Sequence, residues 1–351
     1  TTNGFMGVAV GAGITAIIQS SSATTVMVVG FVNSGLMTLQ QAVWVIMGAN
    51  IGTTITAQLI VLDIGALAPL IAFCGVAIVM FIKTAIWRHY GQIIAGLGIL
   101  FIGMNTMSTS MEPLKDSEAF VNLMVRFQNP LLGILAGMIF TAIIQSSSAS
   151  VGILQALATS GLITLPSAVY VLFGQNIGTC ITAVLAAIGT SRNAKRTTII
   201  HLMFNIIGTC VFTILCMTTP LTEFMMSFTP NPSAQIANMH TLFNVTTTLL
   251  LLPLGVQLAK LAMRILPDRP EEHLDEQQLL YIKPIDTAVE YHVGTSAIIV
   301  NGITKELGRM LEMARSNIDR SFQAVLDGTT QALPKVEQTE AGAVVTVTDA
   351  T

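Results

Sequence analysis

The stretch Thr15-Ala16-Ile17-Ile18-Gln19-Ser20-Ser21-Ser22-Ala23 decides the fold, because the same nine residues recur at 141–149. An offset of 126 positions aligns residues 15–57 with residues 141–183 without a gap, and about 25 of these 43 positions are identical. A second landmark, Gly48-Ala49-Asn50-Ile51-Gly52-Thr53-Thr54, returns as Gly174-Gln175-Asn176-Ile177-Gly178-Thr179-Cys180. A duplication of this length predicts two structurally equivalent copies.

The composition is that of an integral membrane protein. The chain is 52% hydrophobic and only 10% charged, against roughly 25% charged residues in a soluble domain. Residues 1–62 contain no Asp, Glu, Lys or Arg, whereas the segment after Pro267 is rich in them. We therefore divide the chain into membrane repeat 1 with its connecting helices (1–126), membrane repeat 2 (127–266) and a water-soluble tail (267–351).

Each copy is expected to start with a re-entrant hairpin. Residues 4–18 and 23–32 are apolar but shorter than the roughly 20 residues that cross a bilayer, and the four polar residues between them form the tip. Residues 130–158 repeat this pattern. The spans that follow, 39–62 and 165–188, carry two glycines and an amide at their midpoints, so we expect both helices to be broken there.

Three further spans are expected at 66–82, 92–107 and 197–217, and a last one at 236–263. The spans 39–62, 66–82 and 92–107 then separate the two hairpins. Because three is an odd number of crossings, the two copies enter the membrane from opposite faces as an inverted repeat. The predicted fold is an all-α membrane protein with two inverted repeats, each with a re-entrant hairpin and a broken transmembrane helix, and a partial soluble helical tail. One face collects the cations of the loops 83–90 and 189–196 together with Lys260 and Arg264, which predicts that this face is cytoplasmic.

The polar tips suggest ion binding. A half-helix that begins at a Ser triplet presents N–H groups, hydroxyls and the positive end of its dipole, which suits a tetrahedral oxyanion. The facing Asn-Ile-Gly-Thr segments offer uncharged oxygens of the kind that coordinate Na⁺. Small polar residues also hold membrane helices together, but packing would not need the same tip twice.

Two other features have plainer readings. The segments His201-Leu202-Met203-Phe204-Asn205 and His240-Thr241-Leu242-Phe243-Asn244 place His and Asn on one helix face, where interhelical hydrogen bonds are favoured over a proton relay. The four cysteines lie in apolar runs without metal-ligand spacing, so buried thiols and no transition-metal site are expected.

At these motifs the sequence resembles the sodium-dependent phosphate cotransporters, the type II Na/Pi family with its bacterial branch, over about residues 3–265. The resemblance implies Na⁺-coupled symport of inorganic phosphate across the bacterial inner membrane, with Na⁺ as the coupling ion, no other cofactor and no nucleic-acid partner. It also implies that the Ser triplets surround phosphate and that the Gln and Thr residues serve Na⁺. We add the two landmark amides to the phosphate set. The phosphate candidates are Ser20, Ser21, Ser22, Ser146, Ser147, Ser148, Asn50 and Asn176. The sodium candidates are Gln19, Thr53, Thr56, Gln145, Thr179 and Thr182.

The sequence also departs from the family pattern. Cys180 replaces the oxygen ligand that Thr54 offers in the first copy. The span 92–107 precedes the second copy, and no equivalent span precedes the first copy. We therefore expect about thirty residues, including one helix, to be missing from the N-terminal side of the first copy. The tail resembles the start of a cytoplasmic PhoU-like helical domain, with an amphipathic helix at 287–326 that needs a partner and could serve regulation.

Three alternatives remain open from the residues. The carrier could move another small oxyanion. An intramembrane serine hydrolase could also bury serines, but it needs a base, and no His or Lys is suggested near either tip. A channel would need a charged or carbonyl ring that the sequence does not offer.

Overall fold

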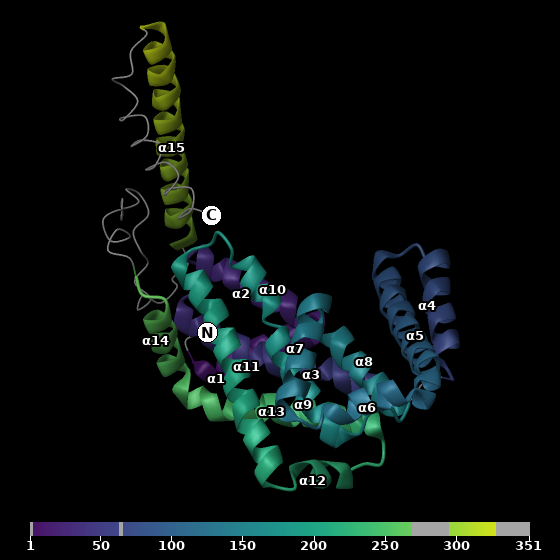
Figure 1. Cartoon of the computed structure of the whole chain (residues 1–351). Coiled ribbons are helices and arrows are strands. Elements are labelled where there is room, and N and C mark those ends of the chain that lie inside the picture. The colour runs from purple at the N-terminus through teal and green to yellow at the C-terminus, as the bar shows by residue number, and fades with distance from the viewer. Residues whose placement is uncertain (1–2, 63–65, 269–294, 328–351) are drawn as a thin grey trace. The chain divides into compact units, whose positions relative to one another are not determined.

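The computed structural model describes residues 3–62, 66–268 and 295–327, and these are almost entirely helical, without a strand in the described ranges. The chain forms two compact units. The first comprises residues 1–33 and 37–266, and the second comprises residues 34–36 and 267–351. Figure 1 shows the helices with their labels.

Copy 1 consists of α1 (Gly4–Ile18), α2 (Ser21–Asn33) and α3 (Leu39–Ile60). The predicted hairpin is confirmed. Thr15 Oγ1 donates to Thr24 Oγ1 at 2.9 Å, although nine residues would separate the two by about 13 Å along a straight helix. The chain therefore folds back on itself at the tip.

Copy 2 repeats this order in α7 (Pro130–Ile144), α8 (Ser147–Thr159), α9 (Leu165–Gly178) and the short α10 (Ile181–Ala186). Thr141 and Ser150, which are equivalent to Thr15 and Thr24, lie 2.6 Å apart at their hydroxyls. Both copies thus close the hairpin with the same hydroxyl pair.

The expectation of a broken helix in each copy is wrong for copy 1. Helix α3 runs unbroken through the landmark. Its glycines serve packing instead, because a Cβ on Gly48 would overlap the carbonyl oxygen of Val8 in α1. The Asn50 amide donates to the Ile46 carbonyl at 3.0 Å and so stays within its own helix. In copy 2 the interruption is confined to Thr179 and Cys180, after the landmark glycines.

Between the copies lie α4 (Ala68–Phe81), α5 (Ala85–Met111), the 3₁₀ helix η1 (Glu112–Asp116) and α6 (Glu118–Arg126). The antiparallel pair α4 and α5 stands at one edge in Figure 1, joined by small residues: a Cβ on Gly98 would overlap Ala72, and one on Gly75 would overlap Ala95. Close approach of this kind is how membrane helices associate. The predicted loop 83–90 is largely helical, since α5 begins at Ala85.

The last part of unit 1 contains α11 (Arg192–Thr218), α12 (Leu221–Ser227), α13 (Pro232–Leu251), η2 (Leu252–Leu254) and α14 (Gly255–Ile265). Residues 192–196, predicted as a loop, form the first turn of α11. The predicted final span is interrupted at η2, where Pro253 lacks the N–H that a continuous helix needs.

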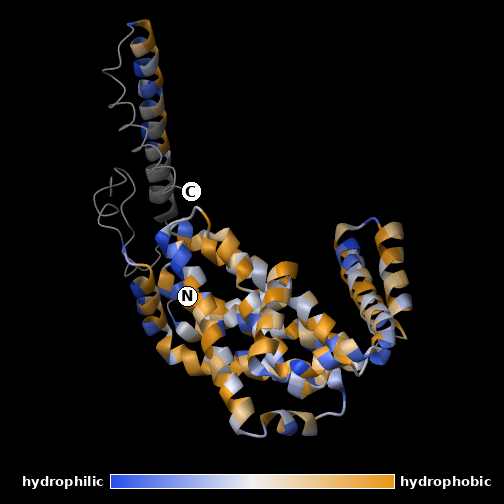
Figure 2. Cartoon of the chain, in the orientation of Figure 1, coloured by the Kyte–Doolittle hydropathy of each residue, from blue (hydrophilic) through white to orange (hydrophobic). Residues whose placement is uncertain are grey.

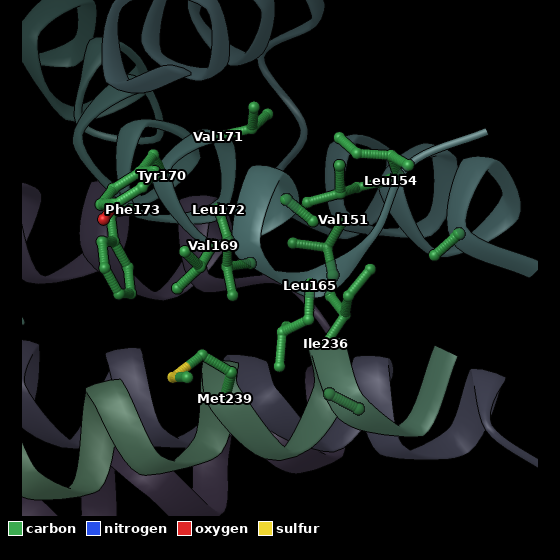
Figure 3. Close-up of a cluster of buried hydrophobic side chains, with 14 of the residues drawn as sticks. Val151, Leu154, Leu165, Val169, Tyr170, Val171, Leu172, Phe173, Ile236 and Met239 are labelled. Carbon is green, nitrogen blue, oxygen red and sulfur yellow. The ribbon is translucent and has the colours of Figure 1, made fainter. Parts of the chain in front are cut away.

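The main core cluster packs α9 against α8 and α13. Figure 3 shows Met239 of α13 facing Val169 and Leu172 of α9, and Ile236 of α13 beside Leu165 of α9. Phe173 stacks on Phe243 with ring centroids 5.1 Å apart. This core fixes copy 2 against the last helices of unit 1.

The described helices match a multi-pass membrane protein. Five are long and apolar enough to cross a bilayer, or six if the bent pair α6 and α7 forms one span. Helix α4 has only 14 residues, about 21 Å, and is shorter than the hydrocarbon core. Large apolar side chains are exposed on it, including Phe73 and Met80, and Figure 2 shows it mostly in hydrophobic colours. These surfaces suit contact with lipid.

The second unit contains α15 (Thr295–Leu326), which confirms a helix in the tail. Residues 287–294 of the predicted helix lie outside the described residues. Leu311, Phe322 and Val325 are each at least two-thirds exposed. The helix therefore presents an apolar face of the kind that the sequence predicts.

Candidate functional site at the paired hairpin tips

The chain turns sharply at the same glutamine in both hairpins. Gln19 has φ 58° and Gln145 has φ 59°, and these are the two non-glycine residues with positive φ in the described ranges. This left-handed conformation is uncommon for a side chain with a Cβ and marks functional sites in many proteins. In each hairpin the turn at this glutamine leaves only two residues between the end of one helix and the start of the next.

The serine after each glutamine caps the second half-helix. Ser20 Oγ accepts the Ala23 N–H at 3.2 Å, and Ser146 Oγ accepts the Ala149 N–H at 3.3 Å. A cap of this kind satisfies one of the N–H groups that a helix start leaves without an internal partner. Each hydroxyl keeps its proton for donation to a ligand.

The two tips meet at the pseudo-two-fold axis. Ser21 Oγ and Ser147 Oγ lie 3.4 Å apart, and both residues are buried. Because each serine is the first residue of its half-helix, the N-termini of α2 and α8 converge on one place. The sequence predicted two anion-binding tips, and the fold brings them together.

The third serines reach across to the opposite copy. Thr182 Oγ1 of α10 donates to Ser22 Oγ at 3.3 Å, and Ser148 Oγ donates to Thr56 Oγ1 of α3 at 3.5 Å. The two pairs are equivalent under the repeat offset. Residues predicted to bind phosphate therefore contact residues predicted to bind Na⁺. The candidate site needs residues from both copies.

The remaining sodium candidates divide unequally between the copies. Thr56 Oγ1 donates to Gln19 Oε1 at 2.8 Å, so this pair is joined in copy 1. In copy 2 the Gln145 residue is exposed, and Thr182 Oγ1 bonds the Thr179 carbonyl instead. Thr53 and Thr179 each donate to the carbonyl four residues earlier, that of Ala49 and that of Gln175.

The landmark amides also differ. Asn50 and Asn176 donate to equivalent carbonyls, those of Ile46 and Leu172. Asn176 Oδ1 also lies 3.1 Å from His240 Nε2, which is a link that sequence reasoning did not assign. The repeated His-Asn spacing was the available signal.

The site has hydroxyls, amides and two helix N-termini but no charged side chain among the residues named above. Donors of this kind are able to hold an oxyanion, and neutral side-chain oxygens are able to coordinate a cation.

Comparisons with known proteins show the family to which the chain belongs. The sequence profile of the family described as Na⁺/Pi-cotransporter matches residues 1–109 and again residues 102–230, one match for each copy. No solved structure matches the chain.

Several curated relatives are similar over most of this chain. The uncharacterized protein YqeW of Bacillus subtilis is 35% identical over 256 residues, which cover 72% of this chain and 82% of YqeW. The putative inorganic phosphate export protein YjbB of Salmonella typhimurium is 29% identical over 277 residues, or 77% of this chain and about half (51%) of YjbB.

A human protein, sodium-dependent phosphate transport protein 2B, is 31% identical over 107 residues, which cover 29% of this chain and 16% of that protein. The family profile spans well over half of the chain, and both of its matches contain a hairpin and the landmark helix that follows it. The chain therefore belongs to the Na⁺/Pi-cotransporter family, and it is a multi-pass membrane protein.

Proposed function

We propose that this protein moves inorganic phosphate across the plasma membrane in symport with Na⁺, by alternating access around the paired hairpin tips. The convergence of Ser21 and Ser147 at 3.4 Å carries the proposal, because it focuses two helix N-termini on one buried place. Inverted repeats of this type place substrate at the repeat interface near the membrane midplane.

In this proposal phosphate binds between the two Ser triplets. Ser21 and Ser147 would lie nearest the axis, and Ser22 and Ser148 would close the site from the sides, where Thr182 and Thr56 now hold them. The caps Ser20 and Ser146 would donate their hydroxyl protons. Asn50 and Asn176 would complete the donor set from the landmark helices.

Sodium would bind beside the phosphate through neutral oxygens. Gln19, Thr53 and Thr56 form the candidate set in copy 1, and Gln145, Thr179 and Thr182 form it in copy 2. The hydrogen bond between Gln19 and Thr56 supports the first set, because two of its three oxygens are already adjacent. Because α3 is unbroken, these side chains rather than freed backbone carbonyls would supply the ligands of the first set.

The direction of transport would follow the gradients. The relative YjbB is named as a putative phosphate exporter, whereas protein 2B is named as sodium-dependent. A symporter runs whichever way the summed Na⁺ and phosphate gradients favour, so an inward Na⁺ gradient would drive import.

A serine hydrolase gains no support from the described contacts. The hydroxyls of Ser21, Ser22 and Ser148 bond to other hydroxyls, and His240 bonds to an amide. A nucleophilic serine requires an adjacent base.

Uptake of labelled phosphate into proteoliposomes tests the proposal. An inward Na⁺ gradient should drive accumulation, and an equal K⁺ gradient should not. Excess unlabelled arsenate or sulfate would reveal whether another oxyanion competes. Uptake that is the same in both gradients would exclude Na⁺ coupling, and no phosphate uptake by folded protein would exclude phosphate as the substrate.

A further inference from the structure

Helices α11 and α13 carry the same four residues at the same spacing. His201, Phe204, Asn205 and Thr209 in α11 correspond to His240, Phe243, Asn244 and Thr248 in α13. The positions recur every three to four residues, so each set lies along one side of its helix. We call these sets the α11 motif and the α13 motif.

The two motifs hold equivalent places in the two copies. Thr209 Oγ1 of the α11 motif donates to the Phe173 carbonyl of α9 at 3.3 Å. Thr248 Oγ1 of the α13 motif donates to the Met47 carbonyl of α3, also at 3.3 Å. Residues 47 and 173 are separated by the repeat offset, so the pseudo-two-fold that relates the hairpins also exchanges α11 and α13.

This symmetry requires two further pairs of contacts, and the structure makes only one member of each. His240 Nε2 bonds Asn176 Oδ1 at 3.1 Å, but within the described residues no hydrogen bond joins His201 to Asn50, the equivalent pair. Asn205 Nδ2 donates to Cys180 Sγ at 3.3 Å, but Asn244 makes no equivalent bond to Thr54 in the described part of the chain. Of these two pairs, the contacts to Asn176 and Cys180 are made, and the equivalent contacts to Asn50 and Thr54 of α3 are open.

The open side leaves buried polar atoms unsatisfied. His201 is 1% exposed, and neither of its ring nitrogens has a hydrogen-bond partner among the described residues. Asn244 Oδ1 is unsatisfied in the same sense, and so is its equivalent Asn205 Oδ1, so the asymmetry lies in the histidines: His240 Nε2 has a partner and neither ring nitrogen of His201 does. Such atoms are costly unless they find a partner in some state of the protein. Met47 of α3 and Phe204 of α11 belong to one core cluster, so the segments that carry Asn50 and His201 pack in the same part of the fold.

We propose that His201 and His240 are positioning residues that hold Asn50 and Asn176 in alternation during the transport cycle. In the state described here His240 holds Asn176. In the opposite state the two copies exchange roles, His201 holds Asn50, and the His240 bond opens. This inference rests on the proposed alternating-access function, because only an inverted repeat that exchanges its halves needs both contacts in turn.

The exchange of the two histidine bonds would restrain one landmark Asn side chain at a time. The hydrogen bond from His240 to Asn176 Oδ1 restrains the Asn176 side chain, so in this state the side chain does not rotate toward the tips. The Asn50 side-chain oxygen has no bond to His201 in the described residues, so the bond from its Nδ2 to the Ile46 carbonyl is the one that restrains this amide. The tautomer is set by the contact: an amide oxygen only accepts, so His240 donates from Nε2.

The first test replaces each histidine by a ring of similar shape without nitrogen. H240F removes a hydrogen bond that this state contains, so it should lower the melting temperature of the resting protein and slow uptake. H201F removes none and should leave the melting temperature unchanged or higher, yet slow phosphate uptake by about fivefold or more, as expected for losing one hydrogen bond in the opposite state. Uptake by H201F at the parent rate would overturn the proposal.

The second test needs no transport, so it separates this inference from the proposed function. N176H with native His240 and N50H with native His201 each create a pair of imidazoles that Zn²⁺ can bridge when the two approach. Zn²⁺ should raise the melting temperature of both variants in detergent, but not that of N176H/H240F or N50H/H201F. Stabilisation of N176H alone, or of neither variant, would show that His201 does not reach residue 50 and would contradict the exchange.

Discussion

The two hairpin tips are nearly identical in structure, whereas the landmark helices that face them are not. Gln19 and Gln145 differ by one degree in φ, and their serine caps differ by 0.1 Å in length. In contrast, α3 is one continuous helix of 22 residues, while its counterpart stops at Gly178 and resumes as α10. The tip depends on its own residues, whereas the landmark helix also depends on its neighbours.

The largest expected effect concerns the packing that the two copies share. A Cβ on Gly11 would overlap the Val45 carbonyl, and one on Gly137 would overlap the Val171 carbonyl. Neither backbone can yield easily, so G11A and G137A should each destabilise the fold by roughly 1–3 kcal/mol or prevent folding. Size-exclusion profiles and thermal unfolding in detergent would measure this.

Gly13 offers a matched control on the same helix, because a Cβ there meets no atom within 4 Å. G13A should behave as the parent protein. If the losses of stability in G11A and G137A differ strongly, then the two hairpins do not pack against their landmark helices in the same way.

The next effect concerns the serine pair on the axis. S21A and S147A should each reduce phosphate uptake by tenfold or more, because each removes a buried donor from the proposed phosphate site. The double variant should lose less than the product of the two effects, since the two hydroxyls touch. Initial rates in proteoliposomes would give the coupling.

Thr106 supplies the control for this prediction, because its hydroxyl bonds its own helix on the exposed side of α5. T106A should transport at the parent rate. Strictly multiplicative losses in S21A and S147A would indicate that the two serines act at separate sites.

A smaller effect should distinguish the two sodium sets. Thr56 contacts both Gln19 and Ser148, whereas Thr182 contacts Ser22 and a backbone carbonyl. T56V should therefore raise the Na⁺ concentration for half-maximal uptake by several-fold, and by more than T182V does. The opposite order would place the tighter Na⁺ site in copy 2.

The smallest effect concerns the residue at the interruption. C180T gives copy 2 the residue of copy 1 and keeps an acceptor for Asn205, so the melting temperature should change by only a few degrees. If C180T raises it strongly, then the thiol rather than the surrounding packing causes the interruption between α9 and α10. T54C is the reciprocal control.

Much of the fold was predictable from the repeated residues. Apolar segments that are too short to cross a bilayer, joined by Gln-Ser-Ser-Ser, predict helical hairpins, and α1 with α2 and α7 with α8 confirm them. The glycines of the second landmark misled the prediction. Glycine permits a helix break, but it also permits close contact between helices, and only the neighbouring helix decides between the two.

The candidate site was predictable in its residues and not in its contacts. The sequence by itself determined two matched tips and two matched landmarks, because local turn and capping chemistry depends on residues close together in the chain. Only the tertiary structure decided that Ser21 meets Ser147, that each tip reaches the opposite copy, and that His240 rather than His201 holds a landmark amide. Those pairings join residues 64 to 160 positions apart, in helices whose packing angles cannot be read from any local sequence pattern.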